Sequence, residues 1–145
     1  MYKQIVFALL MLMSSSSIIA QDINAKKGVA VHGYDVVAYF DGAAQEGSKA
    51  HQVEHEGTTY RFASATNAKR FKDAPEAFLP EYGGYCAYAI AKNGKKVDVN
   101  PETFEIRDGK LYLFYNSWGN NTLKKWLKEP EVLQKLADSN WNPQH

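Results

Sequence analysis

The sequence contains very little sulfur. Its 145 residues include one cysteine, Cys86, so no disulfide can form within the chain. The three methionines are Met1, Met11 and Met13, all close to the N-terminus. Loss of this stretch would leave no thioether ligand, which argues against a methionine-rich copper carrier.

The sequence also lacks an excess of charge of one sign. It has 17 Lys and Arg against 16 Asp and Glu, a formal net charge of +1. The lysine doublets at 26–27, 95–96 and 124–125 are separated by acidic residues and form no basic stripe, so we expect no nucleic-acid partner. Because no glycine-rich phosphate loop, HExxH or GxSxG motif is present, a binding protein is favoured over an enzyme.

Long hydrophobic runs are missing too. The apolar stretch Ile5–Met13 follows Lys3 and is too short to cross a hydrocarbon core of about 30 Å as a helix. A positive residue, a short apolar stretch and a small residue before the cut are typical of a secretory signal. We therefore expect a signal peptide over 1–20, cut after Ala20, and a periplasmic or secreted mature chain without stable membrane insertion. An uncleaved anchor is the alternative, because Ile18 is larger than the ideal residue two places before Ala20.

The remaining chain has the size of one domain and contains neither repeats nor a linker rich in Pro, Gly or Ser. We expect a flexible leader over residues 21–31, a domain over 32–141 and a disordered tail over 142–145. Hydrophobic patterning predicts strands at 36–40, 51–55, 58–62, 82–89, 104–106 and 111–115. The turns Glu56-Gly57 and Asp108-Gly109 join two pairs of these strands as hairpins.

Helices are predicted where capping residues precede apolar positions at helical spacing. Ser64 suits the N-cap of a helix that runs to Asp73, and Pro75 opens a short turn. The last two helices are expected to pack through Leu123, Trp126, Leu127, Val132, Leu133, Leu136 and Ala137, with Trp141 folding back on the body. The predicted fold class is α+β: a small single domain of antiparallel hairpins with short helices, the C-terminal helices packed on the sheet.

Cys86 is the first candidate for chemistry. It follows Gly83-Gly84 and Tyr85, where the glycines allow close approach of another backbone. Its thiol could be a metal ligand, a redox-active group or a small buried core residue. With no second cysteine in the chain, disulfide exchange would require another protein.

His32 is the natural companion of Cys86, because it lies in a turn beside Gly33. A thiolate and an imidazole could hold copper or zinc, or form an ion pair that activates the thiol. The imidazole could equally bond the backbone of its own turn. The residues expected to line a pocket around Cys86 and His32 are Tyr34, Asp35, Gly83, Gly84 and Tyr85.

His51 and His55 form a second histidine pair, four residues apart. On a helix this spacing would place both on one face, but the surrounding pattern predicts a strand. Along a strand the two positions lie roughly 13 Å apart. We therefore do not expect His51 and His55 to bind one ion together.

Several segments together resemble the YHS domain family. They are Gly33–Phe40, Gly57–Ser64, Phe71, Pro75, Pro80–Ala87 and Asp108–Leu113, and the resemblance extends from about residue 32 to Trp141. It implies an exported, single-domain member of a family regarded as metal-binding and found beside copper-transport proteins. The histidine of that family's signature is Ala63 in this chain, and no cysteine lies in the following helix.

The expected function is therefore an exported binding module that holds a transition metal, copper or zinc, or a small ligand near Cys86 and His32. One alternative is a thiol-dependent redox or enzyme-like protein in which His32 activates Cys86. A second alternative is a structural or protein-interaction domain in which Cys86 fills the core.

Overall fold

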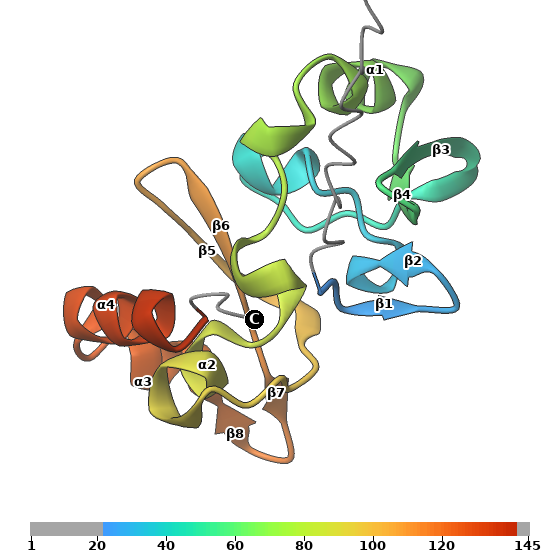
Figure 1. The fold of residues 1–145 in the computed structure, drawn as a ribbon. Coiled ribbons are helices and arrows are strands. Elements are labelled where there is room, and N and C mark those ends of the chain that lie inside the picture. Colours follow the sequence, from blue (N-terminus) through green and yellow to red (C-terminus); the bar gives the residue numbers. More distant parts are fainter. Residues whose placement is uncertain (1–21, 142–145) are drawn as a thin grey trace, which may run out of the picture.

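The computed structural model describes residues 22–141, so the expected signal peptide and C-terminal tail lie outside the described residues. Strands β1 (Ala25–Lys26), β2 (Val29–Ala30), β3 (Ser48–His55) and β4 (Thr58–Phe62) form one sheet in the order β1-β2-β4-β3 (Figure 1). The hairpin β3–β4 turns at Glu56-Gly57, as predicted. β2 pairs with β4 in the parallel sense, which adds the N-terminal segment to this sheet.

A second hairpin consists of β5 (Asn100–Arg107) and β6 (Lys110–Phe114), which turn at Asp108-Gly109 as predicted. The short strands β7 (Asn116–Ser117) and β8 (Asn120–Asn121) form a further pair after it. In Figure 1 the β5–β6 hairpin lies beside the helices of the C-terminal half, whereas the four-stranded sheet belongs to the N-terminal half. The α+β class predicted from the sequence is confirmed.

The described part of the chain contains four α-helices: α1 (Ala65–Asp73), α2 (Ala87–Asn93), α3 (Thr122–Trp126) and α4 (Pro130–Trp141). Ser64 caps α1 by accepting a hydrogen bond from Asn67 N, and Asn121 caps α3 by accepting one from Leu123 N. The Ser64 cap agrees with the sequence prediction. Within residues 22–141 no helix has the length and apolar character needed to span a bilayer.

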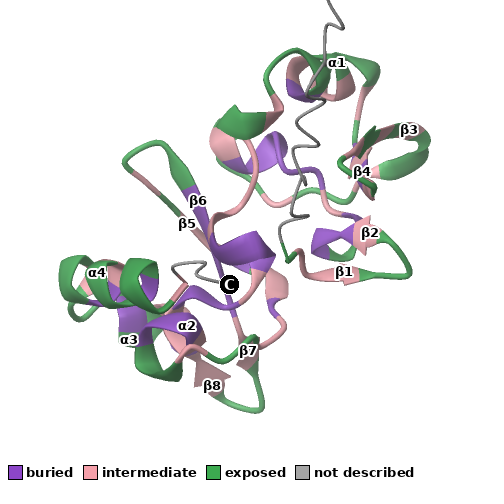
Figure 2. Ribbon diagram, viewed as in Figure 1, coloured by how far each residue is buried: buried purple, intermediate pink, exposed green. Residues whose placement is uncertain are grey.

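The buried side chains form two adjoining clusters. The larger cluster joins the sheet to β6 and includes Tyr60, Phe62, Phe71 and Leu113. The smaller cluster places Trp126 of α3 and the inner face of α4 against β6, as predicted for the C-terminal helices. Figure 2 shows the buried residues gathered on β6 and around α2 and α3, with exposed residues along the outer side of α4.

The N-terminal segment and the region 36–40 differ from expectation. Residues 22–31 do not form a loose leader, because β1 and β2 extend the sheet and Ala30 is buried. The strand predicted at 36–40 is absent, and the 3-10 helix η2 (Ala38–Asp41) occupies much of this segment. The reason is local: Asp35 Oδ1 accepts hydrogen bonds from Val37 N and Ala38 N, which bends the chain into a helical turn.

The prediction of a strand within 82–89 is also wrong. The 3-10 helix η4 (Glu81–Gly84) leads into α2, and Gly83 and Gly84 both have positive φ. Residues Ala87–Ala91 pack into the smaller core cluster. Because a short apolar run is found both in buried strands and in buried helices, its composition alone does not predict which of the two forms.

Two residues predicted to face the core from α4 are exposed. Leu133 and Ala137 are buried, but Val132 and Leu136 are 53% and 46% exposed. Only the narrow face of α4 that holds Leu133 and Ala137 therefore packs against the core. Trp141 packs back as predicted, with its ring 6.3 Å from that of Tyr82 and 6.2 Å from that of Tyr85.

Candidate functional site

Cys86 is fully buried and belongs to the larger core cluster. Its sulfur lies 3.4 Å from Thr122 Oγ1, and the Thr122 hydroxyl donates to Tyr115 O at 2.6 Å. Because a hydroxyl has one proton to donate, the Cys86 thiol must be the donor to Thr122. The structure thus contains a protonated, hydrogen-bonded core thiol.

The burial of Cys86 predicts that its thiol reacts only when the domain opens. We expect an aromatic disulfide reagent to label the native chain at least about a thousandfold more slowly than the chain unfolded in urea. The Cys86→Ala variant supplies the blank for both rates. Comparable native and unfolded rates would contradict this assignment and favour an activated thiolate.

His32 takes a different partner. Its Nε2 lies 2.9 Å from Asp98 Oδ1, on a turn whose φ of 53° is left-handed. The segments of His32 and Cys86 do approach each other, because Cys86 N donates to Val97 O at 2.9 Å, one residue before Asp98. The two side chains nevertheless bond separately, the imidazole to a surface carboxylate and the thiol to a buried hydroxyl.

Asp98 is the centre of this surface network. Lys26 Nζ lies 2.8 Å from Oδ2, while Asn24 Nδ2 and the Val99 amide donate to Oδ1 at 2.8 and 2.7 Å. Burial alone would raise the pKa of Asp98, but the bonds from Lys26, Asn24, His32 and Val99 outweigh it and hold the pKa well below its usual range. Asp98 therefore fixes His32 and the N-terminal strand to the body.

The residues expected to form a pocket wall with Cys86 contact the N-terminal segment. Asn24 N donates to Gly83 O at 2.8 Å, and Asn24 Nδ2 donates to Gly84 O at 3.2 Å. A Cβ at Gly83 would lie 2.1 Å from Asp22 O, so only glycine permits this approach. The Tyr85 hydroxyl donates to Asp22 Oδ1 at 3.1 Å. These three residues form the surface on which residues 22–24 lie.

Asp35, another expected pocket residue, is fully buried and acts as a structural acceptor. Its Oδ1 bonds Val37 N and Ala38 N, and its Oδ2 accepts from Ala63 N at 2.9 Å and from Asn67 Nδ2 at 2.8 Å. The carboxylate thus joins η2 to the start of α1. Metal ligation by Asp35 would compete with these four bonds.

Tyr34 lies on an open pocket of about 580 Å³. Its hydroxyl is 3.4 Å from Glu102 Oε1, and partial burial together with the charges of Glu102 and Glu46 raises the pKa of Tyr34. Ala63, the position where the YHS resemblance would place a histidine, lines the same pocket. Tyr34 is therefore an expected pocket residue that does line a cavity.

A different group of side chains has the composition of a metal site. Donor atoms of His55, Glu56 and Glu76 all lie within 4.8 Å of one another. Nε2 of His55 is 3.6 Å from Glu76 Oε1 and 3.9 Å from Glu56 Oε1, both beyond hydrogen-bond length. Within the described part of the chain this nitrogen is buried and has no hydrogen-bond partner. A cation between the three groups would satisfy all of them.

Local structure brings these three residues together. His55 ends β3, Glu56 opens the β-turn that follows, and Glu76 lies in the 3-10 helix η3 (Pro75–Ala77) after α1. The His55 ring meets the rings of Tyr60 and Phe71 edge-on, with centroids 6.4 and 5.8 Å away. These aromatic contacts hold the imidazole while its Nε2 faces the carboxylates.

The spacing of His51 and His55 gives no indication of this group, because its other members are carboxylates from outside β3. Both histidines do lie on β3, as predicted. The hairpin turn places Glu56 beside His55 and was readable from the Glu56-Gly57 signal. Glu76 is twenty-one positions further on, and only the packing of α1 against the sheet brings it near His55.

Comparison of the chain with family models, with curated proteins and with solved structures gives no match. The resemblance to the YHS domain family accordingly stays a prediction made from the residues.

Proposed function

We propose that the mature chain is an exported, YHS-like metal-binding module rather than an enzyme. It binds one divalent transition-metal ion, zinc or copper(II), through His55, Glu56 and Glu76. The observation that carries this proposal is the buried His55 Nε2, which has no hydrogen-bond partner among the described residues and faces two carboxylates. The family resemblance supports the same class of function.

The separations between the three donors support ligation more than hydrogen bonding. Ligands at about 2.0–2.2 Å from a tetrahedral zinc ion are about 3.3–3.6 Å from one another. The distances of 3.6 and 3.9 Å from His55 Nε2 to the carboxylates are close to this range. Small rotations of Glu56 and Glu76 would complete the approach, and both side chains are largely exposed and free to make them.

The types of donor favour a particular set of metals. One imidazole and two carboxylates suit zinc or copper(II), whereas copper(I) prefers thiolate and thioether sulfur. The only thiol of the chain, Cys86, is buried and bonded to Thr122. We therefore expect copper(I) to bind weakly or not at all.

Three protein ligands leave a coordination position open. A closed structural zinc site has four protein ligands, while an open site keeps a position for water or another molecule. The Glu76 side chain is 78% exposed, so a bound ion could reach solvent on this side. An accessible, incomplete site suits a protein that takes up and releases metal.

The test is calorimetric titration of the mature chain with zinc(II), copper(II) and copper(I). We expect one zinc(II) or copper(II) per chain, and at least a tenfold loss of affinity for both in His55→Ala. The matched control is His51→Ala, which removes a histidine from the same strand without touching the three ligands. Equal loss in both variants, or no saturable binding by the wild type, would rule out this site.

A further inference from the structure

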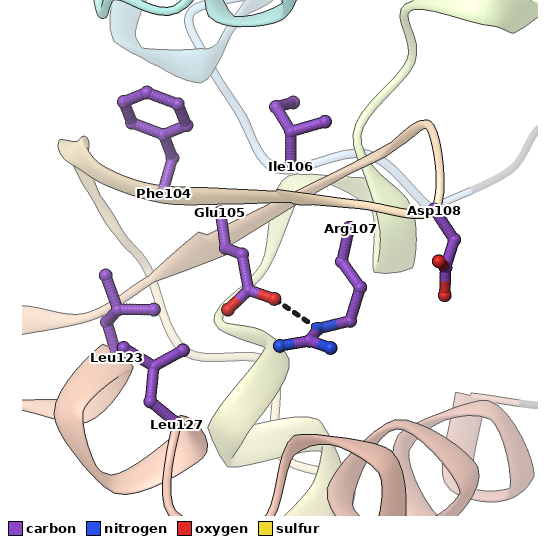
Figure 3. Close-up of a pocket in the computed structure, with 7 residues that line it drawn as sticks. All are labelled: Phe104, Glu105, Ile106, Arg107, Asp108, Leu123 and Leu127. Carbon is purple, nitrogen blue, oxygen red and sulfur yellow. Dashed lines mark hydrogen bonds and ion pairs between the residues drawn. The ribbon is translucent and has the colours of Figure 1, made fainter.

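A second feature lies away from the proposed metal site. An open pocket of about 480 Å³ is lined by Phe104, Glu105, Ile106, Arg107, Asp108, Leu123 and Leu127 (Figure 3). Glu105 and Arg107 project from one face of β5, toward the side where Leu123 and Leu127 lie, while Phe104 and Ile106 project from the other face. This is the alternation that a strand imposes. The pocket therefore combines an ion pair with an aliphatic wall.

The ion pair has unused hydrogen-bonding capacity. Arg107 Nε donates to Glu105 Oε1, and no other bond from the guanidinium is present among residues 22–141. Glu105 is only 13% exposed, and its second oxygen, Oε2, is buried without a partner in the described structure. A buried carboxylate oxygen without a donor is unfavourable. Because Oε2 has almost no accessible surface, a ligand reaches it only when the Glu105 side chain rotates toward the pocket, and the ligand then supplies the missing N–H or O–H group.

The charges on the two side chains restrict what that ligand can be. A cation would pair with Glu105 but would meet the Arg107 guanidinium. An anion would pair with Arg107 but would meet the Glu105 carboxylate. A neutral carboxamide has a donor and an acceptor side by side, and it can give its N–H to Glu105 Oε2 while its carbonyl accepts from Arg107.

The apolar wall accounts for the rest of such a ligand. Leu127 is 51% exposed, and Leu123 lies beside it across the pocket from the ion pair. An apolar group placed here would cover the leucine side chains while the amide reaches β5. We propose that this pocket binds a neutral carboxamide carried on a small apolar body. The site shares no residue with the metal ligands, so it stands independently of the proposed function.

Three probes of equal shape and different charge test the proposal: benzamide, benzoate and benzamidinium. Each is titrated into the folded chain while NMR follows the Leu127 methyl groups and the Arg107 Nε–H. We expect benzamide to shift both signals saturably at about millimolar concentration, as its size implies. Both charged probes should bind at least about tenfold more weakly. Equal affinity for the three probes, or no saturable shift with benzamide, would overturn the proposal.

Variants connect the binding to the named side chains. In Glu105→Gln the unbalanced Arg107 should create a preference for the anion, so that benzoate binds at least about tenfold better than benzamidinium. The matched control is Glu102→Gln on the same strand, whose side chain bonds Tyr34 outside this pocket and which should keep the wild-type preference. Leu127→Ala is at an exposed position and should weaken benzamide about threefold or more without unfolding the chain. Wild-type selectivity in Glu105→Gln together with unchanged affinity in Leu127→Ala would refute the assignment.

Discussion

Replacement of Asp35 by alanine is expected to lower the free energy of unfolding by about 3–5 kcal/mol, because several buried donors lose their acceptor and each unsatisfied buried donor costs about 1–3 kcal/mol. The carboxylate has no exposed surface and accepts four hydrogen bonds, from Val37 N, Ala38 N, Ala63 N and Asn67 Nδ2. Alanine would leave these donors without their acceptor in the core. Urea unfolding of the chain measures the difference.

A neighbouring aspartate supplies the control for this experiment. Asp41 also bonds a residue of α1, but its partner is the exposed Arg70, at 2.7 Å. Surface pairs contribute about 0–1 kcal/mol, so Asp41→Ala should change the stability little. If Asp35→Ala is no more destabilising than Asp41→Ala, the bonding role given to Asp35 is incorrect.

Zinc(II) is expected to stabilise the folded chain strongly. A ligand that binds only the folded state at one hundred times its Kd adds about 2.7 kcal/mol to the free energy of unfolding. His55→Ala and Glu76→Gln should lose most of this zinc-dependent gain, because each removes one of the three proposed ligands. Thermal unfolding with and without zinc(II), at fixed protein concentration, measures this zinc-dependent gain in stability.

Two further variants separate ligation from folding. Glu56 has a left-handed φ of 48° in the β3–β4 turn, a conformation that asparagine adopts more readily. Glu56→Asn should therefore keep or improve the stability of the metal-free chain while reducing the zinc-dependent gain. His51→Ala should retain the full gain. A zinc-dependent gain that survives in both His55→Ala and Glu76→Gln would place the ion elsewhere.

Much of the fold follows from local signals in the sequence. Asp108-Gly109 and Glu56-Gly57 mark their hairpins because both turn residues adopt positive φ, and glycine does so without strain. Ser64 and Asn121 cap their helices through side-chain acceptors that are typical of such positions. These features depend on a few adjacent residues, so they can be read without knowledge of the tertiary structure.

The errors occur where tertiary contacts decide the conformation. The segment 36–40 has the apolar and aromatic composition of a strand, but the Asp35 carboxylate bonds the amides that a strand would offer to a neighbour. Residues 22–31 are ordered instead of forming a leader because polar residues among them bond distant groups, such as Asn24 to Asp98 and Gly83. Neither a propensity nor a spacing rule contains these partners.

The candidate site was only partly accessible from the sequence for the same reason. Cys86 and His32 stood out as single residues of reactive types, yet their environments depend on Thr122 and Asp98, far away in the chain. His55 was noticed, and Glu56 follows it directly. Glu76 could not be assigned to the same site, because its position depends on how α1 and η3 lie against the sheet.

The most direct test of the metal proposal is X-ray absorption spectroscopy of the zinc-loaded chain. The proposal predicts a single shell of nitrogen and oxygen at about 2.0–2.2 Å, with scattering from one imidazole that disappears in His55→Ala. A sulfur neighbour at about 2.3 Å would contradict it, because that distance requires the Cys86 thiolate as a ligand.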